Sequence, residues 1–169
     1  ISALARGRKL ITANKELISA HAETLQELAT LNRTGLDFGA AVGGSAPVIS
    51  TLRDLVGASA PRSVRGILNG TCAYILSRMQ LEGTSFADAL GEAQRAGYAE
   101  ADPSEDVDGA DAAAKLAIIA AVGLRRPVRV TDIATKSIRP IETVDFMYAR
   151  ELGCTIRQIA RASAEDSGA

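Results

Sequence analysis

Six carboxylates lie within the twelve residues from Glu100 to Asp111, and a single lysine, Lys115, follows one helical turn after the last of them. Carboxylates can bind a cation or hold a substrate ammonium, and a lysine among them can donate and accept a proton. The acidic segment from Gly97 to Lys115 is therefore the strongest candidate for a functional site in this sequence.

Two of three chemical interpretations of this segment involve no catalysis. Counted from Ser104 as in an EF-hand, Asp106, Asp108 and Gly109 take positions three, five and six, but position twelve is Lys115 where calcium needs a bidentate glutamate. The calcium interpretation fails at that position. A solvated acidic turn that caps a helix is the second interpretation, and it leaves Lys115 unexplained.

The third interpretation is an active site. Asp111 and Lys115 are four positions apart, so one helix presents both on one face, and Asp106 just ahead of that helix can reach the same region. Carboxylates around an ammonium keep it charged and oriented, whereas a second lysine nearby would act in the opposite direction. With Glu100 available for a substrate ammonium, this interpretation predicts acid/base chemistry on an amino-acid substrate.

Composition limits the class of protein. The chain has 169 residues, 47% of them hydrophobic, which suits one domain with a substantial core. The net charge of -1 favours neither nucleic acid nor an anionic membrane as a partner. The apolar run from Leu116 to Leu124 is too short to cross a bilayer, and Cys72 and Cys154 form no disulfide framework. We expect a soluble cytoplasmic protein.

A helix from Lys15 to Leu31 is predicted by its apolar stripe, with Asn14 as its N-cap and a short strand from Lys9 to Thr12 before it. Lys15 then lies in the first helical turn, where the macrodipole disfavours a cation by up to about 1 kcal/mol. An anionic ligand would offset that cost. On local sequence alone, a solvated surface lysine is the simpler interpretation.

A strand from Ser63 to Leu68 is predicted to lead through Asn69-Gly70-Thr71 into a helix over about Cys72 to Gln80. Backbone amides and a hydroxyl at a helix N-terminus are suited to bind an anion. The remaining predicted elements are a small-residue strand from Asp37 broken by a Gly-Gly turn, helices at about 47–55, 85–97, 110–122 and 143–152, short strands around 128–130, 138–141 and 155–160, and a frayed end at 161–169.

Four motifs in order carry a family resemblance: Thr12-Ala13-Asn14-Lys15, Gly43-Gly44-Ser45-Ala46-Pro47, Gly66 to Thr71 followed by Tyr74-Ile75-Leu76, and the acidic segment. Together they resemble homoserine dehydrogenase over roughly Gly7 to Ile159. The resemblance implies the catalytic and dimerisation domain over 1–160. It implies an α+β fold with a mixed, largely antiparallel sheet, covered on one face by helices and involved in a homodimer. The nucleotide-binding domain is expected outside this sequence.

The implied activity is the interconversion of L-homoserine and L-aspartate 4-semialdehyde with NAD or NADP, in threonine and methionine biosynthesis. The chain alone is expected to be inactive without a nucleotide domain. The alternative is a dimerisation or scaffold module of the same fold that has lost its chemistry.

The resemblance also implies roles for individual residues. Lys115 is the expected acid and base, oriented by Asp111, and Lys15 is a second lysine between cofactor and substrate. Glu100 is expected to hold the substrate amino group. The other implied positions are Asp106, Gly70 and Thr71 for the substrate, Gly97 near the nicotinamide, and the carbonyls of Val42, Gly44 and Ala46 for a monovalent cation. Two positions depart from the family pattern: Gly39 replaces a glutamate beside the cation loop, and Ala73 replaces an asparagine beside the substrate loop.

Overall fold

The computed structural model describes residues 1–59 and 61–164 of the chain. These residues form two units. Unit 1 holds Ile1–Val64, Ala114–Ile133 and the described residues from Arg161 onward, and unit 2 holds Arg65–Ala113 and Ala134–Ala160. Each unit is described by itself, and one domain over 1–160 stays a prediction.

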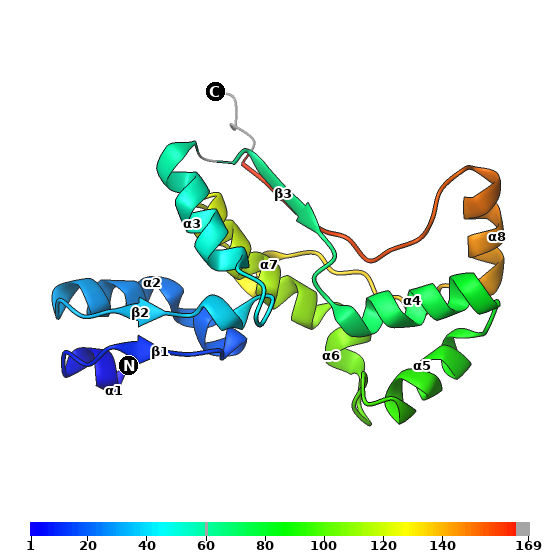
Figure 1. The fold of residues 1–169 in the computed structure, drawn as a ribbon, viewed down its shortest axis with the longest axis horizontal. Helices are drawn as coiled ribbons and strands as arrows, with labels where there is room; N and C mark the ends of the chain where they lie inside the picture. Colours follow the sequence, from blue (N-terminus) through cyan, green and yellow to red (C-terminus); the bar gives the residue numbers. More distant parts are fainter. Residues whose placement is uncertain (60, 165–169) are drawn as a thin grey trace. The chain divides into compact units, whose positions relative to one another are not determined.

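Unit 1 contains a long helix, α2 (Lys15–Leu31), in contact with a pair of short parallel strands (Figure 1). The side-chain oxygen of Asn14 accepts a hydrogen bond from the backbone N–H of Leu17 at 2.7 Å, which confirms the predicted N-cap. The other elements of unit 1 are α1 (Ser2–Ala5), β1 (Leu10–Ile11), β2 (Leu36–Asp37), η1 (Gly39–Ala41), α3 (Val48–Ala58) and η2 (Val130–Asp132).

Unit 2 is organised around α4 (Gly70–Glu82), which packs against α5 (Phe86–Arg95), α6 (Ser104–Val107) and α8 (Thr143–Glu151) (Figure 1). Helix α4 begins two residues earlier than predicted, because the Asn69 side chain accepts a hydrogen bond from the backbone N–H of Cys72 at 2.8 Å. It ends at Gly83, whose φ of 66° is the left-handed conformation typical of a glycine C-cap.

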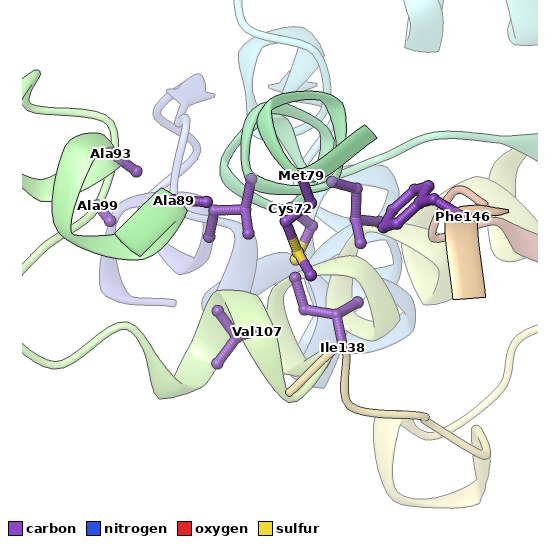
Figure 2. Close-up of a cluster of buried hydrophobic side chains, with 10 residues drawn as sticks. Cys72, Met79, Ala89, Ala93, Ala99, Val107, Ile138 and Phe146 are labelled. Atoms are coloured by element: carbon purple, nitrogen blue, oxygen red, sulfur yellow. The ribbon is translucent and has the colours of Figure 1, made fainter. Parts of the chain in front are cut away.

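One stripe of α4 forms the centre of the unit 2 core. Cys72, Ile75, Leu76 and Met79 follow the helical spacing of three and four residues, and each is fully buried. Figure 2 shows the labelled side chains of this core gathered around Cys72 and Met79. Burying an aliphatic side chain of this size contributes about 1.5 to 3 kcal/mol, so this stripe fixes α4 as the frame of unit 2. The remaining core residues are Ala89, Ala93, Ala99, Val107, Ile138 and Phe146.

Helix α7 (Ala110–Gly123) confirms the helix predicted at 110–122, and most of its residues are buried. It begins in unit 2 and continues in unit 1. Gly123 permits close packing, because a Cβ at this position would lie 3.0 Å from the side chain of Leu52. Along the described chain, no helix is both long enough and apolar enough to cross a membrane.

The α+β class is confirmed, and the described strands form two separate pairs. β1 and β2 are parallel, with Leu10 opposite Leu36. β3 (Ser63–Gly66) pairs with β4 (Ala160–Ser163). The pair is antiparallel, because the backbone N–H of Ala164, just after β4, donates to the carbonyl of Arg62, just before β3, at 2.8 Å. The prediction of a frayed end from residue 161 is wrong for 161–163, because pairing with β3 orders this polar stretch. Residues 165–169 lie outside the described residues.

The predicted short strands at 128–130 and 138–141 are also wrong, since the described residues between α7 and α8 form no strand. In the second of these segments, Ile138 packs into a core instead of forming a strand. Ile138 is 3% exposed and donates its backbone N–H to the carbonyl of Val107 at 2.9 Å, so it fills the unit 2 core from a loop. An alternating pattern that arises from loop residues inserted into a core resembles a strand in sequence.

Candidate active site

The side chain of Asn69 joins two carboxylates of the acidic segment. Its Nδ2 donates to Asp106 Oδ1 at 2.6 Å and to Asp111 Oδ2 at 2.8 Å. Asp106 lies on α6 and Asp111 lies in the first turn of α7. Asp106 therefore lies in the same region as Asp111, as predicted. Asn69, which joins them, is indicated by the sequence only as part of a turn before a helix.

Burial makes these hydrogen bonds important. Asn69 is 3% exposed and Asp111 is 6% exposed, and a buried carboxylate without partners is strongly disfavoured. The Asn69 amide gives one oxygen of Asp111 a hydrogen-bond donor, and Asp111 lies in the first turn of α7. Unit 2 thus holds a buried, hydrogen-bonded carboxyl group at the head of the helix that carries Lys115.

Cys72 lies beside this pair but is chemically inert. Burial raises the pKa of its thiol to about 12, and the charges of Asp106, Asp111 and Asp108 act in the same direction. The thiol donates a hydrogen bond to the carbonyl of Asp106 at 3.2 Å. Because the reactive form of a cysteine is the thiolate, Cys72 serves here as a core residue and not as a nucleophile.

Thr71 links the start of α4 to the beginning of the acidic segment by a hydrogen bond. Its hydroxyl donates to the backbone carbonyl of Tyr98 at 2.8 Å, and the rings of Tyr74 and Tyr98 lie 4.8 Å apart between centroids. Since the Thr71 proton is engaged, its oxygen can only accept a hydrogen bond from a ligand. Gly97 precedes Tyr98 with a φ of 77°, a conformation that favours glycine.

Two predicted substrate residues, Gly70 and Glu100, are exposed on unit 2. A Cβ placed on Gly70 would meet no described atom within 4 Å, so the fold itself does not require glycine there. The segment holding Glu100 is fixed through its backbone, because the Gln94 side chain donates to the carbonyl of Glu100 at 3.0 Å. The Glu100 carboxylate is thereby presented to solvent from an anchored segment.

The acidic segment divides into carboxylates with different tasks. Asp108 accepts hydrogen bonds from Arg139 and Ser137, and these lower its pKa. Asp102 accepts from the hydroxyl and backbone of Ser104, which lowers its pKa. These two acids hold the loop together, while Asp106 and Asp111 meet at Asn69. Arg139 was not indicated by the sequence, because its partner Asp108 lies 31 positions away.

The two predicted lysines lie on α7 and α2. Lys115 is half-buried and follows Asp111 by four residues on α7, so helical geometry gives both the same face. Lys15 is the first residue of α2, and its ammonium lies 3.1 Å from the carboxylate of Glu16. Glu16 thereby offsets the unfavourable position of Lys15 at the helix start. The catalytic roles of both lysines stay predictions.

The predicted cation loop lies in unit 1. Gly43 and Gly44 adopt left-handed conformations, with φ of 82° and 58°, between Val42 and Ala46. The carbonyl of Ala46 accepts a hydrogen bond from Val48 N–H at 2.8 Å and keeps a second lone pair. Among the described residues, no cluster of three or more His, Cys, Asp or Glu side chains could hold a metal ion. A loop that offers only neutral carbonyls suits a singly charged cation.

These observations define a class: an α+β chain with two carboxyl groups joined by an amide and an anchored acidic loop in unit 2, and a lysine four residues after Asp111 on the helix that leaves that unit. Comparison with known proteins gives the family. The family model described as homoserine dehydrogenase matches residues 47–167, and the chain belongs to the homoserine dehydrogenase family.

Relatives and solved structures agree with this assignment. The homoserine dehydrogenase of Synechocystis sp. is 44% identical over 100% of this chain. A crystal structure of a putative homoserine dehydrogenase from Archaeoglobus fulgidus has a TM-score of 0.91, with 44% identity over 96% of this chain and 50% of that one. A hyperthermophilic archaeal homoserine dehydrogenase in complex with NADPH has a TM-score of 0.79, with 29% identity over 95% of this chain and 47% of that one. The chain spans 40% of the length of the Synechocystis relative.

Proposed function

We propose that this chain is the substrate-binding catalytic domain of an oxidoreductase that interconverts L-homoserine and L-aspartate 4-semialdehyde, in the biosynthesis of threonine and methionine. The observation that carries the proposal is the pair Asp106 and Asp111 held by Asn69 at the head of the helix with Lys115, in a chain of this family. Because the chain spans less than half of its relatives, catalysis is expected of the complete protein.

Lys115 is the proposed acid and base. When homoserine is made, its ammonium donates a proton to the aldehyde oxygen, and in the reverse direction its amine takes the hydroxyl proton. Asp111, one turn earlier on α7, orients the Lys115 side chain. A general acid of this kind typically contributes on the order of a hundredfold or more to the rate.

Unit 2 supplies the proposed contacts to the amino-acid part of the substrate. Glu100 pairs with the substrate ammonium from its anchored, exposed position, and Asp106 orients the substrate. Thr71 accepts a hydrogen bond, and Gly70 lets the ligand approach the start of α4 because no Cβ intervenes.

NAD or NADP supplies or removes the hydride when bound, and this chain offers Lys15 and Gly97 toward it. The fit is supported at Gly97, where a Cβ would meet no described atom within 4 Å, so a flat ring can approach the backbone there. The NADPH complex of the archaeal relative supports the class of cofactor.

The test uses the complete protein that contains this chain, assayed by the homoserine-dependent reduction of NAD or NADP. We expect Lys115→Ala to abolish oxidation and leave the fold and assembly intact. Lys136→Ala, at an exposed loop lysine, is the matched control and keeps full activity. Activity of Lys115→Ala within a few-fold of wild type would refute the assignment of Lys115 as the acid and base. An inactive wild type that still assembles would favour the scaffold alternative.

The proposed assembly is a homodimer in the cytoplasm, and sedimentation of the complete protein at twice its chain mass tests the oligomeric state. The carbonyls of Val42, Gly44 and Ala46 are proposed to bind a monovalent cation. To test cation binding, the melting temperature of the protein is measured in potassium or sodium salt and in the salt of a bulky organic cation. Equal melting temperatures would contradict the proposed cation site.

A further inference from the structure

The Asn69 side chain forms hydrogen bonds with residues of α4, α6 and α7. We propose that Asn69 is a positioning residue for the acid/base site. Its carboxamide holds Asp106 and Asp111 beside each other through two hydrogen bonds, and so places two carboxyl groups at the start of the helix that carries Lys115. The inference rests on the proposed function, which assigns tasks to the two carboxylates and to Lys115.

Every hydrogen-bonding group of this buried side chain is used. Both carboxylate bonds come from Nδ2, while Oδ1 caps α4 by accepting from Cys72 N–H. The partners Asp106 and Asp111 lie 37 and 42 positions away in the sequence. A plain N-cap needs only the oxygen, so the two donor bonds are additional to the capping role.

The neutrality of the amide matters. Two carboxylates that share one partner repel each other, and the two hydrogen bonds from the amide counteract that repulsion. An arginine or lysine at position 69 would also bridge them, but its charge would compete with Lys115 for Asp111. An amide holds both carboxylates and leaves their negative charge available to the lysine.

Other residue types fail one of these requirements. Aspartate and serine are good N-caps but lack the two N–H donors, and glutamine carries the donors on a longer chain that is poor at capping. Titratable neighbours of the pair include Cys72 on α4 and Asp108 after α6, and Lys115 follows Asp111 by four residues on α7. Cys72 stays neutral, so the charge balance involves the carboxylates and the lysine.

The decisive variant is Asn69→Ser in the complete protein, because serine keeps the cap and removes the bridge. We expect kcat/KM with homoserine to fall on the order of tenfold to a hundredfold. The acidic limb of its pH profile should move upward, since the two carboxyl groups lose a hydrogen-bond donor each. Asn69→Asp keeps the cap and adds a third carboxylate, and should move the limb further.

Ser85→Ala is the matched control. Ser85 caps α5 through Asp88 N–H at 3.1 Å and donates its hydroxyl to Asp88 Oδ2 at 2.7 Å, so its loss removes one cap and one exposed hydrogen bond and leaves the bonds of Asn69 in place. We expect a lower melting temperature and an unchanged pH profile. If Asn69→Ser behaves in the same way, with only a lower melting temperature, Asn69 is a structural cap and the proposal is overturned.

A second readout requires no enzymatic activity. The melting temperature of each variant is measured between about pH 3 and pH 7, across the titration range of carboxylates. Loss of the bridge should lower the melting temperature by an amount that varies with pH more strongly than the loss caused by Ser85→Ala, because Asn69 donates to two carboxyl groups in a buried site and Ser85 donates to one exposed carboxyl group. A wild type that does not oxidise homoserine would refute the proposed function, and this thermal comparison would still decide whether Asn69 acts through the two carboxyl groups.

Discussion

The guanidinium of Arg139 holds the carboxylate of Asp108 through two hydrogen bonds, from Nε at 2.9 Å and from Nη2 at 3.1 Å. The same Nη2 reaches the hydroxyl of Ser104 at 3.1 Å, so one loop arginine ties together both ends of α6. Asp106 lies between those ends. The position of a proposed substrate contact therefore depends on a residue outside the acidic segment.

Arg139→Gln should raise the KM for homoserine several-fold and lower the melting temperature modestly. The pair is solvent-exposed, so its contribution to stability is reduced by screening. Arg139 lowers the pKa of Asp108, so the stability it adds is present above the unfolded pKa and lost as pH falls through the folded value. The difference in melting temperature between wild type and variant should therefore vanish in acid.

Arg129→Gln is the matched control for this experiment. Arg129 makes the same two-bond pair with Asp132, three residues away within η2 of unit 1. We expect this variant to leave the KM for homoserine unchanged. Equal effects of the two substitutions on KM would refute the role of Arg139 in placing the loop.

Gly70→Ala should impair substrate binding without destabilising the protein. A Cβ at Gly70 meets no described atom within 4 Å, and alanine is favoured over glycine in a helix by about 0.5 to 1 kcal/mol. We expect an unchanged or higher melting temperature and a several-fold higher KM for homoserine. Gly57→Ala, at an equally open glycine of α3, should give the stability effect alone. An unchanged KM for Gly70→Ala would contradict its placement beside the substrate.

Gly97→Ala should affect both stability and cofactor use. Gly97 has a φ of 77°, and a side chain in this conformation costs about 1 to 2 kcal/mol. Gly153 follows α8 with a φ of 67°, and a Cβ there would also meet no described atom within 4 Å. Both variants should melt earlier by similar amounts, but only Gly97→Ala should raise the KM for NAD or NADP. A similar KM in the two variants would remove Gly97 from the cofactor site.

The two cysteines should differ sharply toward a thiol reagent. Cys72 is fully buried with a pKa raised to about 12, so near pH 8 only about one molecule in ten thousand carries its thiolate. Cys154 is exposed. Alkylation of the native complete protein followed by peptide mapping should label Cys154 and not Cys72, and both after unfolding. Labelling of native Cys72 at a comparable rate would contradict its place in the core.

Features encoded by neighbouring residues were predictable. Asn14 as the N-cap of α2 and the helix at 110–122 were both confirmed, because a cap or an apolar stripe involves residues a few positions apart. The acidic segment and its helical lysine were visible for the same reason. The strand prediction failed where apolar loop residues such as Ile138 enter a core, since period alone does not distinguish the two uses.

Contacts between distant residues were decided by the folded chain. Asn69 meets carboxylates 37 and 42 positions away, and Arg139 meets Asp108 across 31 positions. The types of these residues permit many partners, and the packing of α4 against α6 selects one set. The sequence therefore indicates which side chains could carry the chemistry, while the three-dimensional arrangement makes Asp102 and Asp108 loop anchors and joins Asp106 to the buried Asp111 through Asn69. The physical reason is that burial and a specific donor, rather than residue type, determine what a carboxylate can do.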